Sequence, residues 1–208
     1  LERHRRDHGE WPRMVGLVAW GTSAMRTQGD DIAEAMWLIG VRPRWARTSR
    51  RVTGFEIVPL AELGRPRIDV TLRISGFFRD AFGPLVDLVD RAIAAVAALD
   101  EPDEDNFVAA HARADARRLA AQLGQEEAWL RATTRIFGSK PGAYGAGLEQ
   151  LIDARDWRDD ADLAEVYAAW GGYAYGRGRY GAEAREAMRD CYARIEAAVK
   201  NLDTREHD

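Results

Sequence analysis

The stretch Ala132-Thr-Thr-Arg-Ile-Phe-Gly-Ser-Lys-Pro-Gly-Ala-Tyr-Gly-Ala-Gly-Leu-Glu-Gln-Leu-Ile152 contains the strand, the loop and the helix on which the predicted fold depends. Its partly β-branched beginning (133–137) predicts a strand, and its apolar end predicts a helix. The loop between them contains four glycines: Gly138, Gly142, Gly145 and Gly147. Such a loop brings backbone N–H groups and the positive end of a helix close to a ligand.

The position of the lysine argues against a nucleotide-binding loop. A Walker A motif ends in Gly-Lys-Ser/Thr, which places the lysine at the outer phosphates. Here Lys140 comes early in the loop, and Pro141 follows it and removes an N–H donor. The dinucleotide spacing Gly-x-Gly-x-x-Gly is also absent where the strand ends. We therefore expect this loop to approach a ligand other than ATP.

Composition is that of a soluble globular protein. The chain has 208 residues, of which 46% are hydrophobic and 31% charged, and its net charge of −4 gives no reason to expect nucleic acid. A lone cysteine, Cys191, predicts a reducing cytoplasm without disulfides. No apolar run reaches the ~20 residues of a membrane span, so no membrane is expected. The absence of an initial methionine suggests a fragment. We interpret one basic cluster as a solvated loop rather than a binding patch: Arg42, Arg44, Arg47, Arg50 and Arg51.

The first half, residues 1–104, is predicted to be an α/β layer. Apolar or alternating runs predict strands at 14–20, 41–46, 55–60 and 68–74, and helical spacing predicts a helix at 30–39. A long helix follows Ser75-Gly76, and we expect Gly83-Pro84 to bend it.

The second half, residues 105–208, is predicted to be mainly helical, with one strand-loop-helix unit at 132–154. Helices are expected at 107–123, 161–170 and 182–202. The predicted fold class is α/β: a mostly parallel sheet of strand-loop-helix units in the first half, with the helical second half packed on it as one compact unit.

Three strand-to-helix exits share hydroxyl or cationic side chains. If the strands are parallel, the exits lie along one edge of the sheet, where open α/β folds bind ligands. We expect an anionic, polyvalent ligand there, and the alternative is that the hydroxyls only cap helices. The three sets are Thr22, Ser23, Arg26 and Thr27; Arg73, Ser75, Arg79 and Asp80; and Ser139, Lys140 and Tyr144.

The Tyr- and Gly-rich segment 171–181 has two interpretations. It forms either a mobile lid, whose Tyr173 and Tyr175 rings lie on a planar ligand, or a turn between helices. Metal binding has little support, because the four histidines are scattered and Glu206-His207-Asp208 fits a polar chain end. No motif for covalent catalysis is present, and catalytic residues are not identified.

Several long motifs resemble the large subunit of aerobic cobaltochelatase. The opening loop and Trp170-Gly-Gly-Tyr-Ala-Tyr-Gly176 match it. Four further stretches do so in order: Val18-Ala-Trp-Gly-Thr-Ser-Ala-Met-Arg-Thr-Gln-Gly-Asp-Asp31, Glu62-Leu-Gly-Arg-Pro-Arg-Ile-Asp-Val-Thr-Leu-Arg-Ile-Ser-Gly-Phe-Phe-Arg-Asp80, Leu99-Asp-Glu-Pro-Asp-Glu-Asp-Asn-Phe107 and Thr204-Arg-Glu-His-Asp208. The related magnesium chelatase large subunit shares some of these motifs but differs at the loop, where its pattern is closer to Ser-Asn-Ala-Ser-Gly-Ser-Tyr.

The resemblance implies a cytoplasmic, ATP-dependent chelatase of cobalamin synthesis that inserts Co²⁺ into hydrogenobyrinic acid a,c-diamide. In that family the large subunit binds the tetrapyrrole. An AAA+ ATPase subunit and a subunit with an integrin-like metal-binding domain are its partners. Co²⁺ is then a substrate, ATP is hydrolysed by a partner, and no cofactor is expected on this segment. The family's subunit is several times longer, so this segment alone is expected to be inactive.

Two alternatives remain from the sequence. The chain could instead be a docking module for the ATPase partner without a ligand of its own, because its second half is helical and charged. It could also come from a magnesium chelatase large subunit, which shares the Gly-Arg-Pro-Arg-Ile-Asp run.

Overall fold

A six-stranded mixed sheet forms the centre of the molecule in the computed structural model, which describes residues 1–49 and 51–201. Strand β1 (Met14–Ala19) pairs in parallel with β4 (Asp69–Ile74) on one side and with β8 (Ala197–Lys200) on the other. The short β5 (Ile136–Gly138) is parallel to β4, so four neighbouring strands run in one direction. The prediction of an α/β fold with a mostly parallel sheet is confirmed.

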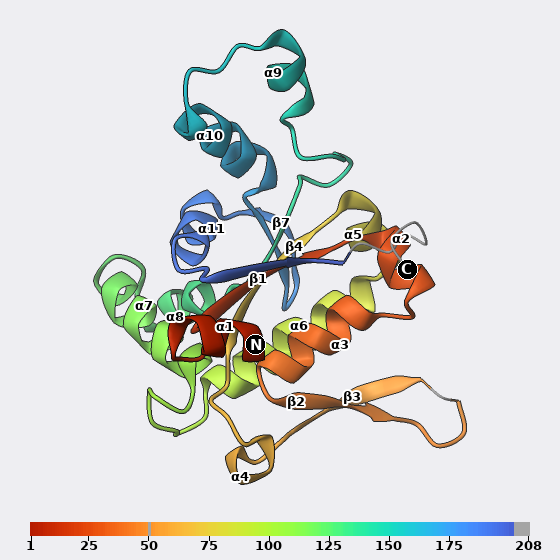
Figure 1. The fold of residues 1–208 in the computed structure, drawn as a ribbon, viewed down its shortest axis with the longest axis vertical. Helices are drawn as coiled ribbons and strands as arrows, with labels where there is room; N and C mark the ends of the chain where they lie inside the picture. Colours follow the sequence, from red (N-terminus) through yellow and green to blue (C-terminus); the bar gives the residue numbers. More distant parts are fainter. Residues whose placement is uncertain (50, 202–208) are drawn as a thin grey trace.

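Helices cover both faces of this sheet (Figure 1). On one face α3 (Asp30–Leu38) and α6 (Gly83–Ala97) pack on the alternate residues of β1 and β4, such as Val15 and Leu72. On the other face α10 (Asp160–Gly171) and α11 (Arg185–Tyr192) cover a smaller cluster. That cluster consists of Met14, Phe137, Met188 and Cys191. Since successive strand residues face opposite sides, each residue's position in the strand decides which face it reaches.

The predicted long helix after β4 is divided in two. Helix α5 (Gly76–Ala81) ends at Phe82, and α6 begins at Gly83 with Pro84 in its first turn. Proline suits the first turn of a helix because no N–H bond is lost there. The bend expected at Gly83-Pro84 is therefore a new helix start. The short helices α1 (Glu2–His8), α2 (Gly21–Arg26) and α4 (Leu60–Leu63) complete the first half.

The expected strands at 41–46 and 55–60 form a separate ribbon. Strand β2 (Val41–Trp45) pairs antiparallel with β3 (Val52–Ile57), and this ribbon projects from the body (Figure 1). The described members of the basic cluster, Arg42, Arg44, Arg47 and Arg51, are exposed as expected, but Arg42 and Arg44 lie on strand β2 and not in a loop. Arg42 also forms ion pairs with Glu56 and Glu62. Arg50 lies outside the described residues.

The second half begins with the predicted helix α7 (Phe107–Leu123). Asn106 caps it by accepting the Ala109 N–H at 2.9 Å, and Gly124 follows its end with a positive φ of 76°. Helix α8 (Gln125–Ala132) precedes the strand-loop-helix unit, and α9 (Glu149–Ala154) is the helix of that unit. The helix expected at 161–170 is confirmed as α10.

The expectations for 171–181 and 182–202 are wrong in their secondary structure. The first segment is neither a lid nor a helix–helix turn but the hairpin β6 (Tyr173–Gly176) and β7 (Arg179–Glu183), which extends the sheet beyond β5. Its two-residue turn, Arg177-Gly178, has positive φ at both positions, as a tight hairpin turn requires. In the described part of the second segment, residues 182–201, the helix is limited to α11, and residues 197–200 pair with β1 as β8.

A buried ion pair ties β4 to the start of β5. Asp69 is fully buried, and Arg135 is 1% exposed. The Arg135 guanidinium donates to the Asp69 carboxylate at 3.0–3.1 Å. Asp69 Oδ2 also lies 2.9 Å from His111 Nδ1. Burial acts to raise the pKa of Asp69, but Arg135 and His111 outweigh it and hold that pKa below its ordinary value.

Within the described ranges, no helix is both long enough and apolar enough to cross a bilayer.

Candidate functional site

The three predicted exits meet at one edge of the sheet. Strands β1, β4 and β5 are neighbours and parallel, so their carboxyl ends lie side by side. The Gly21 N–H donates to Ser75 Oγ at 3.3 Å, which joins the first exit to the second. Glycine is needed at two contacts: a Cβ on Gly21 would lie 2.4 Å from the Phe77 ring, and one on Gly76 would lie 2.6 Å from Tyr144.

Arg79 fixes the glycine-rich loop. Its Nη1 donates to the carbonyl oxygens of Ser139, Lys140 and Ala143 at 3.2, 2.9 and 3.1 Å. Its Nε and Nη2 donate to Asp80 at 2.6 and 2.8 Å. These bonds raise the pKa of Arg79, first through Asp80, and lower the pKa of Asp80 to about 2. The guanidinium is thus buried and directed at the loop, and its predicted contact with a ligand stays a prediction.

The tyrosines at this edge have two different environments. Tyr175 is 2% exposed, and its hydroxyl donates to the Ser139 carbonyl at 2.5 Å. Tyr144 and Tyr180 are about 60% exposed, yet both hydroxyls donate to Asp80, at 2.8 and 3.2 Å. The hydroxyl bonds hold these two rings in place, and each ring is also in contact with the body: Tyr144 packs on Gly76, and Tyr180 makes a T-shaped contact with Tyr175. Tyr173 is partly buried against the core on β6.

The hydroxyls of the exits mostly serve the fold. Ser75 caps α5 by accepting the Phe78 N–H at 3.1 Å, and Ser139 donates to the Ala143 carbonyl at 2.7 Å. Ser23 is 4% exposed, and its hydroxyl has no hydrogen-bond partner among the described residues. Thr22 is exposed on α2. Ser75 therefore caps a helix, as the alternative to ligand binding expected.

The predicted cations do not share one environment. Arg26 and Lys140 are exposed, and Lys140 Nζ forms no ion pair or hydrogen bond within the described part of the chain. Arg73 lies on the other face of the sheet, where its guanidinium is 5.4 Å from the Tyr167 ring of α10 and packs on Gly171. The structure thus leaves Arg73 away from the edge, because its strand position points it under α10.

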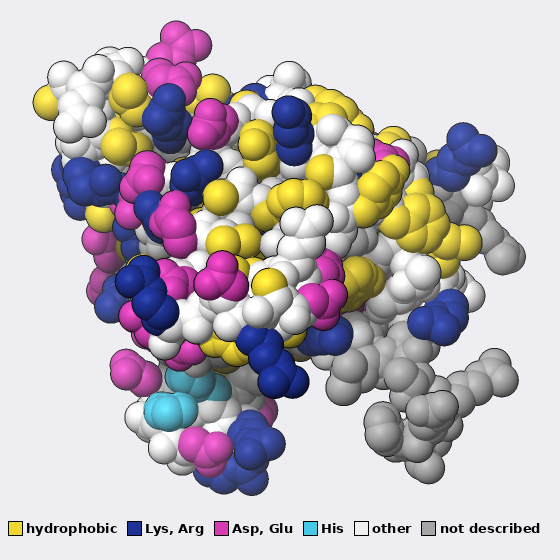
Figure 2. All heavy atoms as spheres, turned by 90° about the horizontal axis from the view of Figure 1, so that it is seen from above, with side chains coloured by type: hydrophobic (Ala, Val, Ile, Leu, Met, Phe, Trp, Pro, Cys, Tyr) yellow, Lys and Arg dark blue, Asp and Glu magenta, His cyan; other side chains and the backbone are white. Residues whose placement is uncertain are grey.

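Exposed aromatic side chains at the edge were not among the predicted site residues. Trp20 and Phe77 are 42% and 41% exposed, and Met25 is 60% exposed. Figure 2 shows hydrophobic side chains gathered on the side of the molecule where α2 and α5 lie. The sequence contained an indication, since an aromatic residue adjoins the glycine at two exits, in Trp20-Gly21 and Gly76-Phe77. We call the surface formed by Trp20, Phe77, Tyr144 and Tyr180 the aromatic edge.

Metal ligands are not grouped in the described ranges. No cluster of three or more His, Cys, Asp or Glu side chains there could hold an ion. Glu206-His207-Asp208 lies outside the described residues. The aromatic edge itself offers exposed aromatic rings, with Lys140 and Arg26 as exposed cations nearby.

Known proteins similar to this chain belong to the family that its motifs resemble. The CobN/Magnesium Chelatase family model matches residues 1–208. The aerobic cobaltochelatase subunit CobN of Sinorhizobium sp. is 58% identical over 209 residues, covering 100% of this chain and 16% of that protein. The chloroplastic magnesium-chelatase subunit ChlH of Oryza sativa subsp. japonica is 39% identical over 210 residues, covering 99% of this chain and 15% of that protein.

A solved structure has the same fold. The catalytic subunit of cobaltochelatase from Mycobacterium tuberculosis matches with a TM-score of 0.93 at 63% identity, covering 100% of this chain and 17% of that one. The chain thus spans about one sixth of the length of these cobaltochelatase relatives. The resemblance found in the motifs is confirmed, and the chain belongs to the CobN/magnesium chelatase family.

Proposed function

We propose that the chain is a segment of the large subunit of an ATP-dependent cobaltochelatase and that its aromatic edge forms part of the tetrapyrrole-binding surface. The proposed reaction inserts Co²⁺ into hydrogenobyrinic acid a,c-diamide, with ATP hydrolysed by a partner subunit. Identity favours cobalt over magnesium, at 58% to the cobaltochelatase relative against 39% to the magnesium chelatase one.

The observation that carries this proposal is the row of exposed rings at the sheet edge. Trp20 and Phe77 are 42% and 41% exposed, and the exposed Tyr144 ring packs on Gly76 with its hydroxyl held by Asp80. Aromatic pairs contribute ~0.5–1.5 kcal/mol beyond the area they bury, so several rings suit a flat macrocycle. Strands β1 and β5 flank β4, which places their ends about 10 Å apart. That span suits a macrocycle better than a small ion.

Charge at the rim supports the same substrate. Lys140 extends from the loop without a partner in the described part of the chain, and Arg26 is exposed on α2. Tetrapyrroles of this class carry peripheral carboxylates around an apolar ring. A rim cation paired with a carboxylate would orient the ring while the aromatic edge supports its face.

We place metal insertion in the rest of the longer large subunit and ATP hydrolysis in a partner subunit. The described residues contain no cluster of metal ligands, and the glycine loop does not have the lysine position of a Walker A motif. We therefore place the ATPase in the AAA+ partner and a second metal-binding role in the partner with an integrin-like domain. The residues that accept the pyrrole protons would lie in the rest of the longer subunit.

A pigment titration on the full-length subunit tests the proposal. Trp20→Ala and Lys140→Glu should each weaken pigment binding about tenfold, because one removes a stacking ring and the other reverses a rim charge. Arg3→Glu is the matched charge reversal, since Arg3 is exposed on α1 away from the aromatic edge. Absorbance and tryptophan quenching report the affinity. Unchanged affinity in both edge variants would refute the assignment of the edge.

The docking alternative gives the opposite pattern. In that case pigment affinity is unchanged in both edge variants, and variants of the charged helices α7 and α11 lose capture of the ATPase subunit. An insertion assay with Co²⁺ and Mg²⁺ and their respective pigments decides between the two chelatases.

A further inference from the structure

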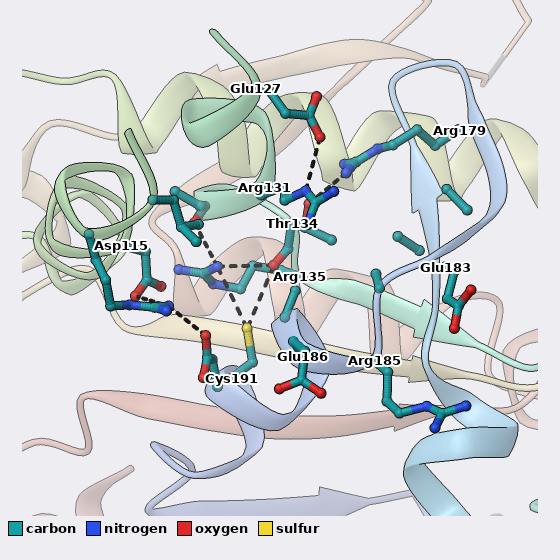
Figure 3. A pocket seen from close by; sticks show the side chains of 18 residues that line it. Asp115, Glu127, Arg131, Thr134, Arg135, Arg179, Glu183, Arg185, Glu186 and Cys191 are labelled. Carbon is teal, nitrogen blue, oxygen red and sulfur yellow. Dashed lines mark hydrogen bonds and ion pairs between the residues drawn. The ribbon is translucent and has the colours of Figure 1, made fainter. Parts of the chain in front are cut away.

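A pocket lies at the opposite end of β5 from the aromatic edge. It has a volume of about 440 Å³ and is enclosed by α7, α8, α11 and the hairpin β6–β7. Thr134 and Arg135, which directly precede β5, form part of its wall, together with Cys191 of α11 (Figure 3). This volume lies in the usual range for small-molecule sites. Nothing in the proposed pigment site uses these residues.

Two guanidinium groups in this pocket point toward one another (Figure 3). Arg179 Nη1 donates to Thr134 Oγ1 at 2.6 Å, while its Nη2 is buried and has no hydrogen-bond partner among the described residues. Arg131 donates through Nε to Glu127 Oε1 at 2.9 Å, and its side chain is 52% exposed. Its terminal nitrogens have no hydrogen bond to the part of the chain that the structure describes. A buried guanidinium N–H without an acceptor is costly.

The charges around the two groups do not balance. Arg177 is a third cation nearby, bonded to Asp90 Oδ2 at 2.7 Å and to Thr133 Oγ1 at 2.9 Å. Asp90 and Glu127 are the carboxylates that face these three arginines. Burial lowers the pKa of Arg179. The nearby cations Arg177 and Arg131 lower that pKa as well, whereas the carboxylates of Asp90 and Glu127 raise it. Among the described residues, three cations thus face two carboxylates at this end of the pocket, which leaves one positive charge in excess.

The other charges of the pocket are already engaged or lie on the far wall. Arg135 is bonded to Asp69, and Arg118 to Asp115 and Asp190. The carboxylates of Glu183 and Glu186 lie on the opposite wall, where β7 ends and α11 begins. Arg185 also lines the pocket and is paired with Glu165. An anion is therefore favoured between α8 and the start of β7, where Arg131 and Arg179 approach each other.

We propose that this pocket binds a small oxyanion between Arg131 and Arg179. Guanidinium groups hold phosphate and carboxylate oxygens with paired, charge-assisted hydrogen bonds, and two facing groups lose their mutual repulsion when an anion lies between them. Arg179 supplies the unpaired Nη2, and Arg131 supplies its terminal nitrogens. Inorganic phosphate is the probe for this class of ligand.

The test is a calorimetric titration of inorganic phosphate into the full-length subunit in a phosphate-free buffer. We expect saturable binding, weakened at least tenfold in Arg179→Met and in Arg131→Met, which corresponds to about 1.4 kcal/mol. Arg179→Lys keeps the charge without the paired geometry and should retain part of the affinity. Arg91→Met is the matched control, because Arg91 is an exposed arginine on α6 outside the pocket.

Folding is checked for each variant by circular dichroism and urea unfolding. If Arg179→Met does not fold, Arg131→Met carries the test, since its side chain forms only an exposed ion pair. Phosphate affinity equal to the wild-type value in Arg131→Met and Arg179→Met overturns the proposal. Absence of saturable binding to the full-length subunit also overturns it, including the case in which an acidic side chain from elsewhere in that subunit already fills the pocket.

Discussion

Replacing Arg79 with methionine should release the glycine-rich loop while leaving the sheet folded. The guanidinium donates to three loop carbonyls and is 2% exposed, so methionine keeps the apolar stem and removes every donor. Bonds to a charged group contribute ~1.5–3 kcal/mol each. Their sum overestimates the loss, because a loop that opens hydrates its own carbonyls. We therefore expect a loss of about 3–5 kcal/mol in the free energy of loop opening, as when one partner of a buried pair is removed.

Amide hydrogen exchange measures this loss directly. The Ala143 N–H bonds to the Lys140 carbonyl inside the loop, so its protection reports loop opening, while amides of β1 and β4 report the sheet. Exchange at Ala143 should accelerate by more than a hundredfold, with little change in the strands. Arg91→Met is the control for the same substitution on an exposed helix. Wild-type protection of Ala143 in Arg79→Met would show that the loop holds its shape without the arginine.

Two further predictions concern other charged groups. Asp69→Asn should lower the free energy of unfolding by ~3–5 kcal/mol in urea, because it leaves the buried Arg135 without its counter-ion, whereas Asp87→Asn on the exposed side of α6 should change it little. The pKa of Asp80 is lowered to about 2, so its contribution to stability is full above pH ~4, its ordinary range, and is lost as the pH falls toward 2. Acid titration of Asp80→Asn should lack this part of the decline, and an acid profile identical to the wild type would contradict it.

The parts of the fold with strong local patterns were predictable. The apolar run of β1 and the alternation along β4 indicate strands by themselves, and α7 has its cap at Asn106 and its end at Gly124. β8 was missed because Ala-Ala-Val-Lys has no strand pattern of its own. Its pairing with β1, more than 170 residues earlier, makes it a strand, and tertiary contacts override propensity there.

The hairpin β6–β7 was missed for a different reason. Alternation in Tyr173-Ala-Tyr175 and a two-residue turn at Arg177-Gly178 fit a hairpin, but the glycine content favoured a loop. Arg177 adopts a positive φ of 42°, which is uncommon for a residue with a side chain. Its guanidinium is bonded to the buried Asp90, a long-range contact that the local sequence does not reveal.

The chemistry of the edge follows from where each arginine side chain can reach. Arg73 stands one residue before the end of β4, so strand alternation sends it to the face beneath α10. Arg79 lies one helical turn after the Ser75 cap, and from there it faces the loop beside it. Two of the cations that suggested an anionic ligand are therefore used within the fold. What the edge presents to solvent is mainly aromatic, with Lys140 at the rim, so a planar ligand would be held by its face first and by its charge second.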